Sequence, residues 1–478
     1  MGLIKHTVLL TLAFVYGVFT IILYACISIK NGTFFTSRTE KENLELQIAR
    51  DRLWDLSKDF AGLSHHIITL ASGFKFHFLS NEAPGSPAAL KSDKPLVIFV
   101  HGFPDSWAIW RHIVSSPSLQ ESANLVAIDL PGYGGSEGLE KYSATRVLEK
   151  MTELIVTLRL QYGVDDESTI RKKKTIIVAH DWGCVISMRL AAEAPSLADR
   201  FILSNGPLAD LVKSNVMRTI DSARKIHKDA RNAPSSSRPP LLQAVRTLKP
   251  LFRQLARSGY IFAMQLPVPL VEFFLIGGNQ SLMRAVHKGS HGKAEFTPRD
   301  AAESMASSMG PSLPESKTQT SNGESYPSTV KYSREFANVM NMAGYYRDGA
   351  ALSRWHKSLE TVAALHHLAG GNDVQRTSSG AGLFDEGAPG VLKASSTVFW
   401  GKLDIALDPT ICLDGMADYL VGDSQIVMLP RSGHFTPIEV ESRAALETAV
   451  QWAVQGEKED IGVAVQRTYE DAKVIARR

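Results

Sequence analysis

Cysteine is scarce in this chain of 478 residues. Only Cys26, Cys184 and Cys412 occur, which is too few for a disulfide framework, and no C-x-x-C pair marks a metal site. Long blocks of Lys or Arg are also absent and the formal net charge is only +3, so nucleic acid is a poor candidate for a partner. No cluster of His and Cys has the spacing of metal ligands. We therefore expect neither a cofactor nor a metal ion.

The first thirty residues lack charge over a long stretch. No Asp, Glu, Lys or Arg occurs from Thr7 to Ile29, and this run is almost wholly apolar. About 20 such residues span the hydrocarbon core as a helix, whereas the apolar part of a cleaved signal peptide has about 7 to 15. We expect a transmembrane anchor at residues 1–30, with a signal peptide as the alternative. Positive charge lies on both sides of the run, so the charge pattern leaves the orientation open.

Short apolar runs rich in β-branched residues recur beyond residue 90. They are continuous rather than alternating, which is typical of parallel strands that are buried on both faces. Helical patterns lie between them, such as the segment that Ser143 can cap and Gly163 can end. These features predict an α/β protein with a mostly parallel, doubly wound sheet. The runs are Pro95–Val100, Leu125–Leu130, Thr175–Ala179, Phe201–Leu203, Thr397–Trp400 and Ile426–Leu429.

Residues 207–350 interrupt this rhythm. They look mostly helical, and strands resume only near residue 396, which indicates a helical lid inserted over the carboxyl edge of the sheet. The expected organisation is an anchor at 1–30, a juxtamembrane linker or helix at 31–60, a core in two parts at 61–206 and 351–456, the lid at 207–350, and a C-terminal tail at 457–478.

The segment Ala179-His180-Asp181-Trp182-Gly183 lies where a strand passes into a helix. This is the position of a nucleophile elbow, usually G-x-nucleophile-x-G, whose sharp turn needs small residues two positions to either side. The nucleophile position holds Asp181, and a carboxylate attacks an electrophilic carbon by displacement to form an ester. An acyl-transfer serine hydrolase is therefore disfavoured. An Asp that merely caps the following helix is the alternative.

A second loop can supply an oxyanion hole for this nucleophile. His101-Gly102-Phe103-Pro104 follows an earlier strand, and such a loop can aim the backbone N–H of Phe103 at the same point as that of Trp182. A simple Gly-Pro turn is the other interpretation of this segment.

A base and an acid follow the last two strands. His434 lies in a Gly-flanked loop that can reach the elbow, where it can act as a general base. Asp404 lies just past the preceding strand and can fix the orientation of the imidazole, with Asp408 as its competitor. The chain order Asp181, Asp404, His434 matches nucleophile, acid and base in α/β hydrolases.

Taken in order, these segments resemble the α/β-hydrolase-fold epoxide hydrolases. The resemblance implies the α/β-hydrolase fold and the opening of epoxides to vicinal diols, through an alkyl ester on Asp181 that water activated by His434 and Asp404 hydrolyses. The matching pieces are HGFPDSW at 101–107, DLPGYGGSE at 129–137, AHDWG at 179–183, GKLD at 401–404 and GHFTPIE at 433–439.

The resemblance also implies two lid tyrosines that donate hydrogen bonds to the epoxide oxygen. Tyr260 begins the segment YIFAMQLP, which is similar to the family's first tyrosine motif, and Tyr346 lies in a Tyr-Tyr-Arg motif similar to the second. A phenol with a pKa near 10 stays a proton donor at neutral pH. Tyr345 is the alternative to Tyr346, and either tyrosine could instead be a core aromatic residue.

Two other functions remain open. A haloalkane dehalogenase shares the elbow Asp and the following Trp, but Phe103 offers no side-chain donor for a halide, Asn205 is not acidic where some relatives carry the acid, and the tyrosine pair has no role there. A catalytically inactive, membrane-tethered interaction protein is possible on the same fold. The expected partners are a small lipophilic epoxide, water and a membrane. We expect a single-pass protein of the endoplasmic reticulum, with the cytosolic side favoured for the catalytic domain.

Overall fold

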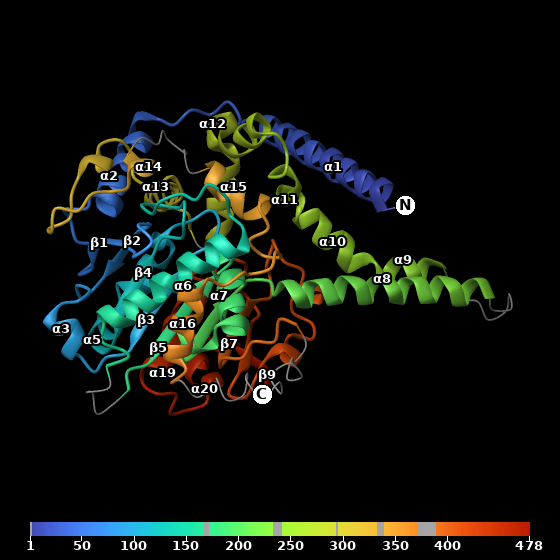
Figure 1. Cartoon of the computed structure of the whole chain (residues 1–478). Helices are drawn as coiled ribbons and strands as arrows, with labels where there is room; N and C mark the ends of the chain where they lie inside the picture. Colours follow the sequence, from blue (N-terminus) through green and yellow to red (C-terminus); the bar gives the residue numbers. More distant parts are fainter. Residues whose placement is uncertain (1, 167–171, 233–240, 293–294, 332–338, 371–388) are drawn as a thin grey trace.

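A nine-stranded sheet forms the centre of the molecule (Figure 1). The computed structural model describes residues 2–166, 172–232, 241–292, 295–331, 339–370 and 389–478. The strand order is β1-β2-β4-β3-β5-β6-β7-β8-β9, and pairing is parallel from β4 to β8 and antiparallel at both edges. The strands are β1 (Ser64–Thr69), β2 (Lys75–Ser80), β3 (Leu96–Val100), β4 (Asn124–Ile128), β5 (Thr175–His180), β6 (Arg200–Ser204), β7 (Ser396–Gly401), β8 (Gln425–Leu429) and β9 (Lys473–Arg477).

Each central strand divides its side chains between two cores, because successive residues of a strand point to opposite faces. On β3, Val97 and Phe99 pack in one core while Ile98 and Val100 pack in the other, and all four are buried. The predicted doubly wound, mostly parallel sheet is confirmed. Helices cover both faces: α4 (Arg111–Val114), α5 (Pro117–Ser122), α19 (Val440–Val454) and α20 (Ile461–Gln466) on one, and α6 (Ala144–Gln161) and α7 (Trp182–Glu193) on the other.

The predicted strand runs correspond to β3 to β8, and the predicted cap and end of α6 are also confirmed. The Ser143 side chain accepts a hydrogen bond from the Arg146 N–H, and Gly163 has a positive φ just past the helix. The edge strands were not predicted. Residues 457–478, expected to be a tail, include α20 and β9, and β9 pairs with β8 as the last strand of the sheet.

Residues 31–60 contain a helix that belongs to the folded body. Helix α2 (Glu40–Trp54) begins with a capping box formed by Thr39 and Glu42. Leu53 and Trp54 are fully buried, and the Trp54 indole donates to the carbonyl of Ala306 in α13 (Pro298–Met309) at 2.9 Å. A helical segment was one of the two forms expected here.

The helical insertion expected between β6 and β7 is present (Figure 1). Most of its helices lie above the carboxyl edge of the sheet, while α8 and α9 project away from the body. The helices are α8 (Ala209–Asn232), α9 (Leu241–Thr247), α10 (Lys249–Arg257), α11 (Gly259–Ala263), α12 (Val268–Ser290), α13, α14 (Ser328–Lys331), α15 (Val339–Arg347) and α16 (Leu359–Leu368).

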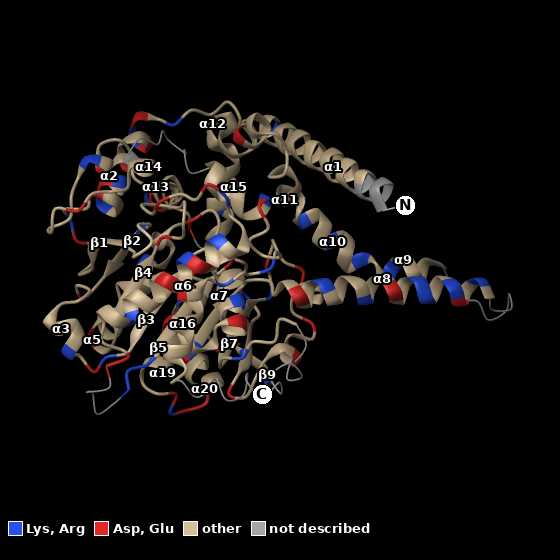
Figure 2. Ribbon diagram, in the orientation of Figure 1, with Lys and Arg blue, Asp and Glu red and all other residues tan. Residues whose placement is uncertain are grey.

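The apolar N-terminal run forms helix α1 (Gly2–Lys30). Its segment Leu10–Lys30 is long and apolar enough to cross a membrane, and most of it is not buried inside the protein. In Figure 2, α1 carries no charged residue over most of its length, whereas the lid helices α8 and α10 carry many. Helix α1 packs against α11 and α12 rather than standing free of the body.

Candidate active site

Asp181 lies at the sharp turn between β5 and α7. Its backbone has φ 51° and ψ −116°, a conformation that costs a non-glycine residue about 1–3 kcal/mol and is typical of functional sites. Two glycines allow the turn to pack: a Cβ on Gly183 would lie 2.3 Å from the Val100 carbonyl oxygen, and a Cβ on Gly206 would lie 2.9 Å from that of Asp181. The turn therefore presents the Asp181 carboxylate at the carboxyl edge of the sheet.

His434 connects two carboxylates. Its Nδ1 lies 2.8 Å from Asp404 Oδ2, and its Nε2 lies 3.4 Å from Asp181 Oδ2. Asp404 is held in turn, since its Oδ1 accepts hydrogen bonds from the backbone N–H groups of Ala406 at 2.7 Å and Leu407 at 2.8 Å. The imidazole is thus oriented by one carboxylate and directed at the other.

Charge coupling shifts the pKa of each member of this row. Burial raises the pKa of Asp181, but the hydrogen bond and the charge of His434 outweigh burial, so the pKa lies below its usual value. The same balance between burial and His434 lowers the pKa of Asp404. Burial lowers the pKa of His434, but the two carboxylates outweigh it and raise that pKa to about 10. At neutral pH the row is an imidazolium between two carboxylates.

The loop after β3 supplies a hydrogen-bond donor to the Asp181 carboxylate. The Phe103 N–H donates to Asp181 Oδ1 at 2.8 Å. A Cβ on Gly102 would lie 2.4 Å from Asp181 Oδ1 and 2.6 Å from the Trp182 nitrogen, so this loop needs glycine to approach the elbow. The two candidate oxyanion donors thus lie where this loop meets the turn at Asp181. They are the backbone N–H groups of Phe103 and Trp182.

Tyr260 on α11 and Tyr346 on α15 come together above Asp181. Their ring centroids are 5.7 Å apart with planes at 83°, and Tyr346 also packs edge-on against Trp182 at 5.0 Å. Burial raises the pKa of both phenols well above 10, and the Asp181 charge adds to this. Both phenols therefore remain proton donors across the physiological range.

The neighbouring candidates, Tyr345 and Asp408, have other partners. The Tyr345 hydroxyl donates to the carbonyl of Pro131 at 2.9 Å, away from the site. Asp408 accepts from Arg253 at 2.6 Å and from the Thr410 N–H at 3.0 Å, where it caps a short helix. Neither reaches the elbow in place of Tyr346 or Asp404.

A cavity of about 190 Å³ joins Asp181 and His434 to the two lid tyrosines. Its polar lining consists of Asp181, His434, Tyr260, Tyr346 and Arg257. The remaining surface is apolar, so the cavity suits a small lipophilic molecule that presents one polar atom to the phenols. The apolar lining comes from Phe103, Pro104, Met264, Phe274, Leu282, Val286, Ile405, Ala406 and Phe435.

Two supporting residues had not been identified from the sequence. Asn205, with φ 49° just after β6, donates from its side-chain amide to Asp404 Oδ2 at 2.7 Å and accepts from the Gly401 N–H at 3.2 Å. The sequence feature that could have identified Asn205 is its position in Ser-Asn-Gly-Pro, directly after a predicted strand. His101 is buried, and its Nδ1 lies 2.9 Å from the Gly102 carbonyl while its Nε2 accepts from the Leu130 N–H at 3.0 Å. Both residues fix the loops that carry the site.

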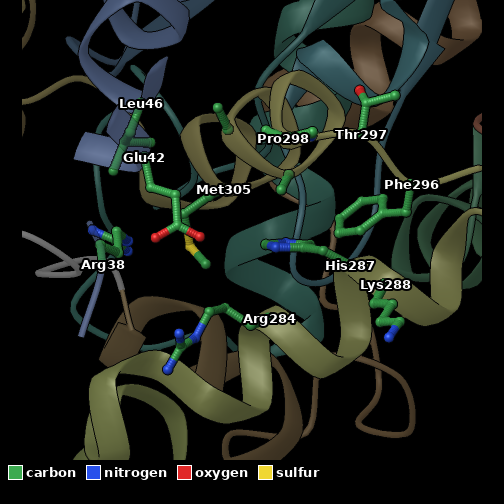
Figure 3. Close-up of a pocket in the computed structure, with 12 residues that line it drawn as sticks. Arg38, Glu42, Leu46, Arg284, His287, Lys288, Phe296, Thr297, Pro298 and Met305 are labelled. Carbon is green, nitrogen blue, oxygen red and sulfur yellow. The ribbon is translucent and has the colours of Figure 1, made fainter. Parts of the chain in front are cut away.

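A second cavity, of about 330 Å³, lies away from this site, between α2, α12 and α13 (Figure 3). Its wall carries Arg38, Arg284 and Lys288, together with Glu42 and His287. In the part of the chain that the structure describes, no group of three or more His, Cys, Asp or Glu side chains could hold a metal ion.

The parallel sheet, with this site at its carboxyl edge, has the α/β-hydrolase fold. Residues 95–238 match the family model of the alpha/beta hydrolase fold. The crystal structure of an aCif variant superposes with a TM-score of 0.51 and 15% identity, covering 87% of this chain and 96% of that one.

The resemblance to epoxide hydrolases is confirmed by sequence relatives. Mouse epoxide hydrolase 3 is 29% identical over 146 residues, which are 30% of this chain and 34% of the relative. Epoxide hydrolase B of Mycobacterium tuberculosis is 31% identical over 127 residues, which are 26% of this chain and 31% of the relative. The matched segment spans about a third of the length of these relatives.

Proposed function

We propose that this protein is an epoxide hydrolase that forms vicinal diols through an ester on Asp181. The observation that carries the proposal is the meeting of one carboxylate, one oriented imidazole and two phenols in a single apolar cavity. The phenols are what favour an epoxide over an alkyl halide, because they can donate to an oxygen that becomes an alkoxide.

In the first step, an epoxide carbon lies against Asp181 while Tyr260 and Tyr346 donate to the epoxide oxygen. The carboxylate is already ionised and needs no base. A bond forms between Asp181 and the carbon as the carbon–oxygen bond of the ring breaks. The resulting alkoxide takes a proton from one phenol, and the imidazolium of His434 supplies the proton that restores this phenol, which leaves His434 neutral.

In the second step, His434 acts as the base that activates water. Esterification removes the Asp181 charge, which is one of the causes of the raised pKa of His434. The imidazole can then accept a proton from water, which attacks the ester carbonyl. The N–H groups of Phe103 and Trp182 stabilise the oxyanion, and its collapse releases the diol and restores the carboxylate. Neutral His434 is therefore produced by the first step and consumed by the second.

We also propose that α1 attaches the enzyme to a membrane, with the endoplasmic reticulum and its cytosolic face as the favoured location. The support is the exposed apolar surface of the helix. A membrane would also concentrate lipophilic epoxides near the catalytic cavity.

Diol formation from styrene oxide, stilbene oxide and a fatty-acid epoxide tests the proposed reaction, with halide release from a chloroalkane as the comparison. We expect diol and no halide. In the double variant Tyr260→Phe with Tyr346→Phe, alkylation should nearly stop, since each donor accounts for about 10- to 1,000-fold. Unchanged diol formation in that variant would remove the basis for the epoxide assignment, and halide release would favour a dehalogenase.

A further inference from the structure

One face of α1 is fitted to the lid over several helical turns. Gly17, Ile21 and Ser28 on this face are buried, and Tyr24 is half-buried. Positions three and four apart lie on one side of a helix, so this spacing describes a single stripe. The stripe contains small and hydroxyl-bearing residues, which are typical of close helix packing in an apolar medium.

The contacts of this stripe are specific. The Tyr16 hydroxyl donates to the carbonyl of Leu255 in α10 at 2.9 Å, and the Tyr24 hydroxyl is hydrogen bonded to Ser281 in α12. A Cβ on Gly17 would lie 2.6 Å from the carbonyl oxygen of Phe262 in α11, so the two helices touch at their backbones. The hydroxyl groups of Tyr16 and Tyr24 therefore each form a hydrogen bond with the lid.

The opposite face of α1 is apolar and exposed. Large apolar residues on the neighbouring lid helices α10 and α12 are also exposed, so the apolar surface continues beyond α1. On α1 the exposed apolar residues outside the stripe are Leu12, Val15, Phe19, Ile22, Leu23, Ile27 and Ile29, and on the lid they are Phe252, Leu255, Val268, Leu270, Phe273 and Ile276.

This packing conflicts with a helix that crosses the bilayer along its normal. Tyr16 lies 14 residues before Lys30, or about 21 Å along the helix at 1.5 Å per residue. The hydrocarbon core is about 30 Å thick. With Lys30 at one surface, the lid residues that touch Tyr16 and Gly17 would lie beyond the midplane, and Arg253 and Arg257 of α10 would be carried into hydrocarbon. Charged side chains are costly at that depth.

We propose that α1 lies along one leaflet, with its exposed face in the acyl chains, and that it forms a single membrane-binding surface with α10 and α12. The N-terminus then stays on the same side of the membrane as the catalytic domain. Tyr16 and Tyr24 share one depth in this arrangement, and the charges of α10 stay on the water side.

A basic cavity lies at the end of this surface and complements an anionic lipid headgroup. Arg284 of α12 donates to the carbonyl oxygens of Thr33 at 2.9 Å and Thr36 at 3.0 Å, in the loop directly after α1. Figure 3 shows Arg284 lining the cavity with Arg38, Lys288 and one carboxylate, Glu42. Cations placed beside a membrane-embedded helix are attracted by anionic lipids. In the proposed arrangement, the cavity therefore lies at the depth of the lipid phosphate groups.

This inference rests on the proposed membrane attachment, and two readouts separate them. The full chain, with one protease-cleavable tag before Met1 and another after Arg478, is placed in sealed vesicles with the C-terminal tag outside. Cys26 is exposed on α1 while Cys184 and Cys412 are buried, so an impermeant maleimide reports the surroundings of α1.

We expect protease to remove both tags without detergent, while the maleimide labels Cys26 only after detergent is added. Protection of the N-terminal tag, with Cys26 still shielded, would mean that α1 crosses the membrane and would overturn the one-leaflet arrangement. Labelling of Cys26 without detergent would overturn membrane attachment itself. Diol formation in the same vesicles shows that the tagged chain is folded, independently of either result.

Discussion

At the scale of single residues, the main feature is that the charge of His434 depends on the state of Asp181. The imidazole lies between two carboxylates that raise its pKa to about 10, and only one of them, Asp404, keeps its charge during the proposed reaction. In the proposed reaction, the resting site is therefore arranged for attack on the epoxide, and the esterified site is arranged for attack by water.

His434→Gln should separate the two steps. Asp181 needs no base, so alkylation should continue, while hydrolysis should stop because no group takes the proton from water. Intact-mass spectrometry after mixing with styrene oxide should show a gain of one epoxide on the peptide that contains Asp181. Wild-type enzyme turned over in heavy-oxygen water should carry the label in the same carboxylate. Diol formation by the wild type without a mass gain in the variant would favour direct attack of water on the epoxide.

The alkylation step should be nearly independent of pH between about pH 5 and pH 9. The pKa of Asp181 is lowered, so the carboxylate stays ionised until the pH falls through a value below 3.8. The pKa values of Tyr260 and Tyr346 are raised above 10.0, so both donors keep their protons as the pH rises through this range. Rapid-quench mass analysis of a single turnover measures this rate. A tenfold increase from pH 6 to pH 8 would instead show that neutral His434 is needed before alkylation.

At the scale of helices and strands, Glu303 of α13 joins three separate parts of the chain. Its carboxylate accepts from Arg111 beside the sheet at 3.0 Å, from Arg52 of α2 at 2.8 Å and from Arg299 of its own helix at 2.9 Å. Arg111 is 1% exposed and Glu303 is 5% exposed. This buried group attaches α2 and the lid to the core.

Glu303→Ala should destabilise the protein by about 3–5 kcal/mol, because it leaves the buried Arg111 charge without its carboxylate. The control is Arg299→Met, which removes an ion pair whose arginine side chain is 69% exposed and should cost less than about 1 kcal/mol. Urea unfolding followed by tryptophan fluorescence measures both. Equal losses of unfolding free energy in the two variants would show that the buried pair of Arg111 and Glu303 stabilises the protein no more than the exposed pair does.

The sequence predicts the sheet-borne part of the site better than the rest, for a physical reason. Asp181, Asp404 and His434 each lie in the turn or loop after a buried strand, and the strands bring their carboxyl ends to one edge. Tyr260 and Tyr346 lie on lid helices where no local pattern distinguishes a donor from a core aromatic residue, so only the family resemblance pointed to them. Strands β1, β2 and β9 were missed because polar residues interrupt or flank their short apolar runs.

At the scale of the whole molecule, α1, the lid and the catalytic cavity form successive layers. Phe274 of α12 lines the cavity and also packs edge-on against Tyr24 of α1 at 5.5 Å. Helix α11 carries Tyr260 and contacts Gly17. Only the lid helices separate α1 from the cavity. A displacement of α1 should therefore also displace the side chains that line the cavity.

Gly17→Leu should displace α1 from α11, because its Cβ alone would lie 2.6 Å from the Phe262 carbonyl oxygen. We expect diol formation to fall by about 10- to 100-fold, the scale of a misplacement near 1 Å, with membrane association retained. Cys26→Leu, on the exposed face of the same helix, is the control and should leave activity unchanged. If both variants keep full activity, the position of α1 does not affect Tyr260.

The stripe of α1 has a consequence for the order in which the protein is made. Tyr24 and its partner Ser281 are 257 residues apart in the chain. A ribosome that adds about 5 to 20 residues per second needs roughly 13 to 50 seconds to cover that distance. Throughout that time the Tyr24 hydroxyl lacks its hydrogen-bond partner in the lid, whereas the apolar face of α1 has already been synthesised. Under the proposed membrane attachment, the membrane receives this helix well before the lid is made, and the lid must pack on a helix that is already in place.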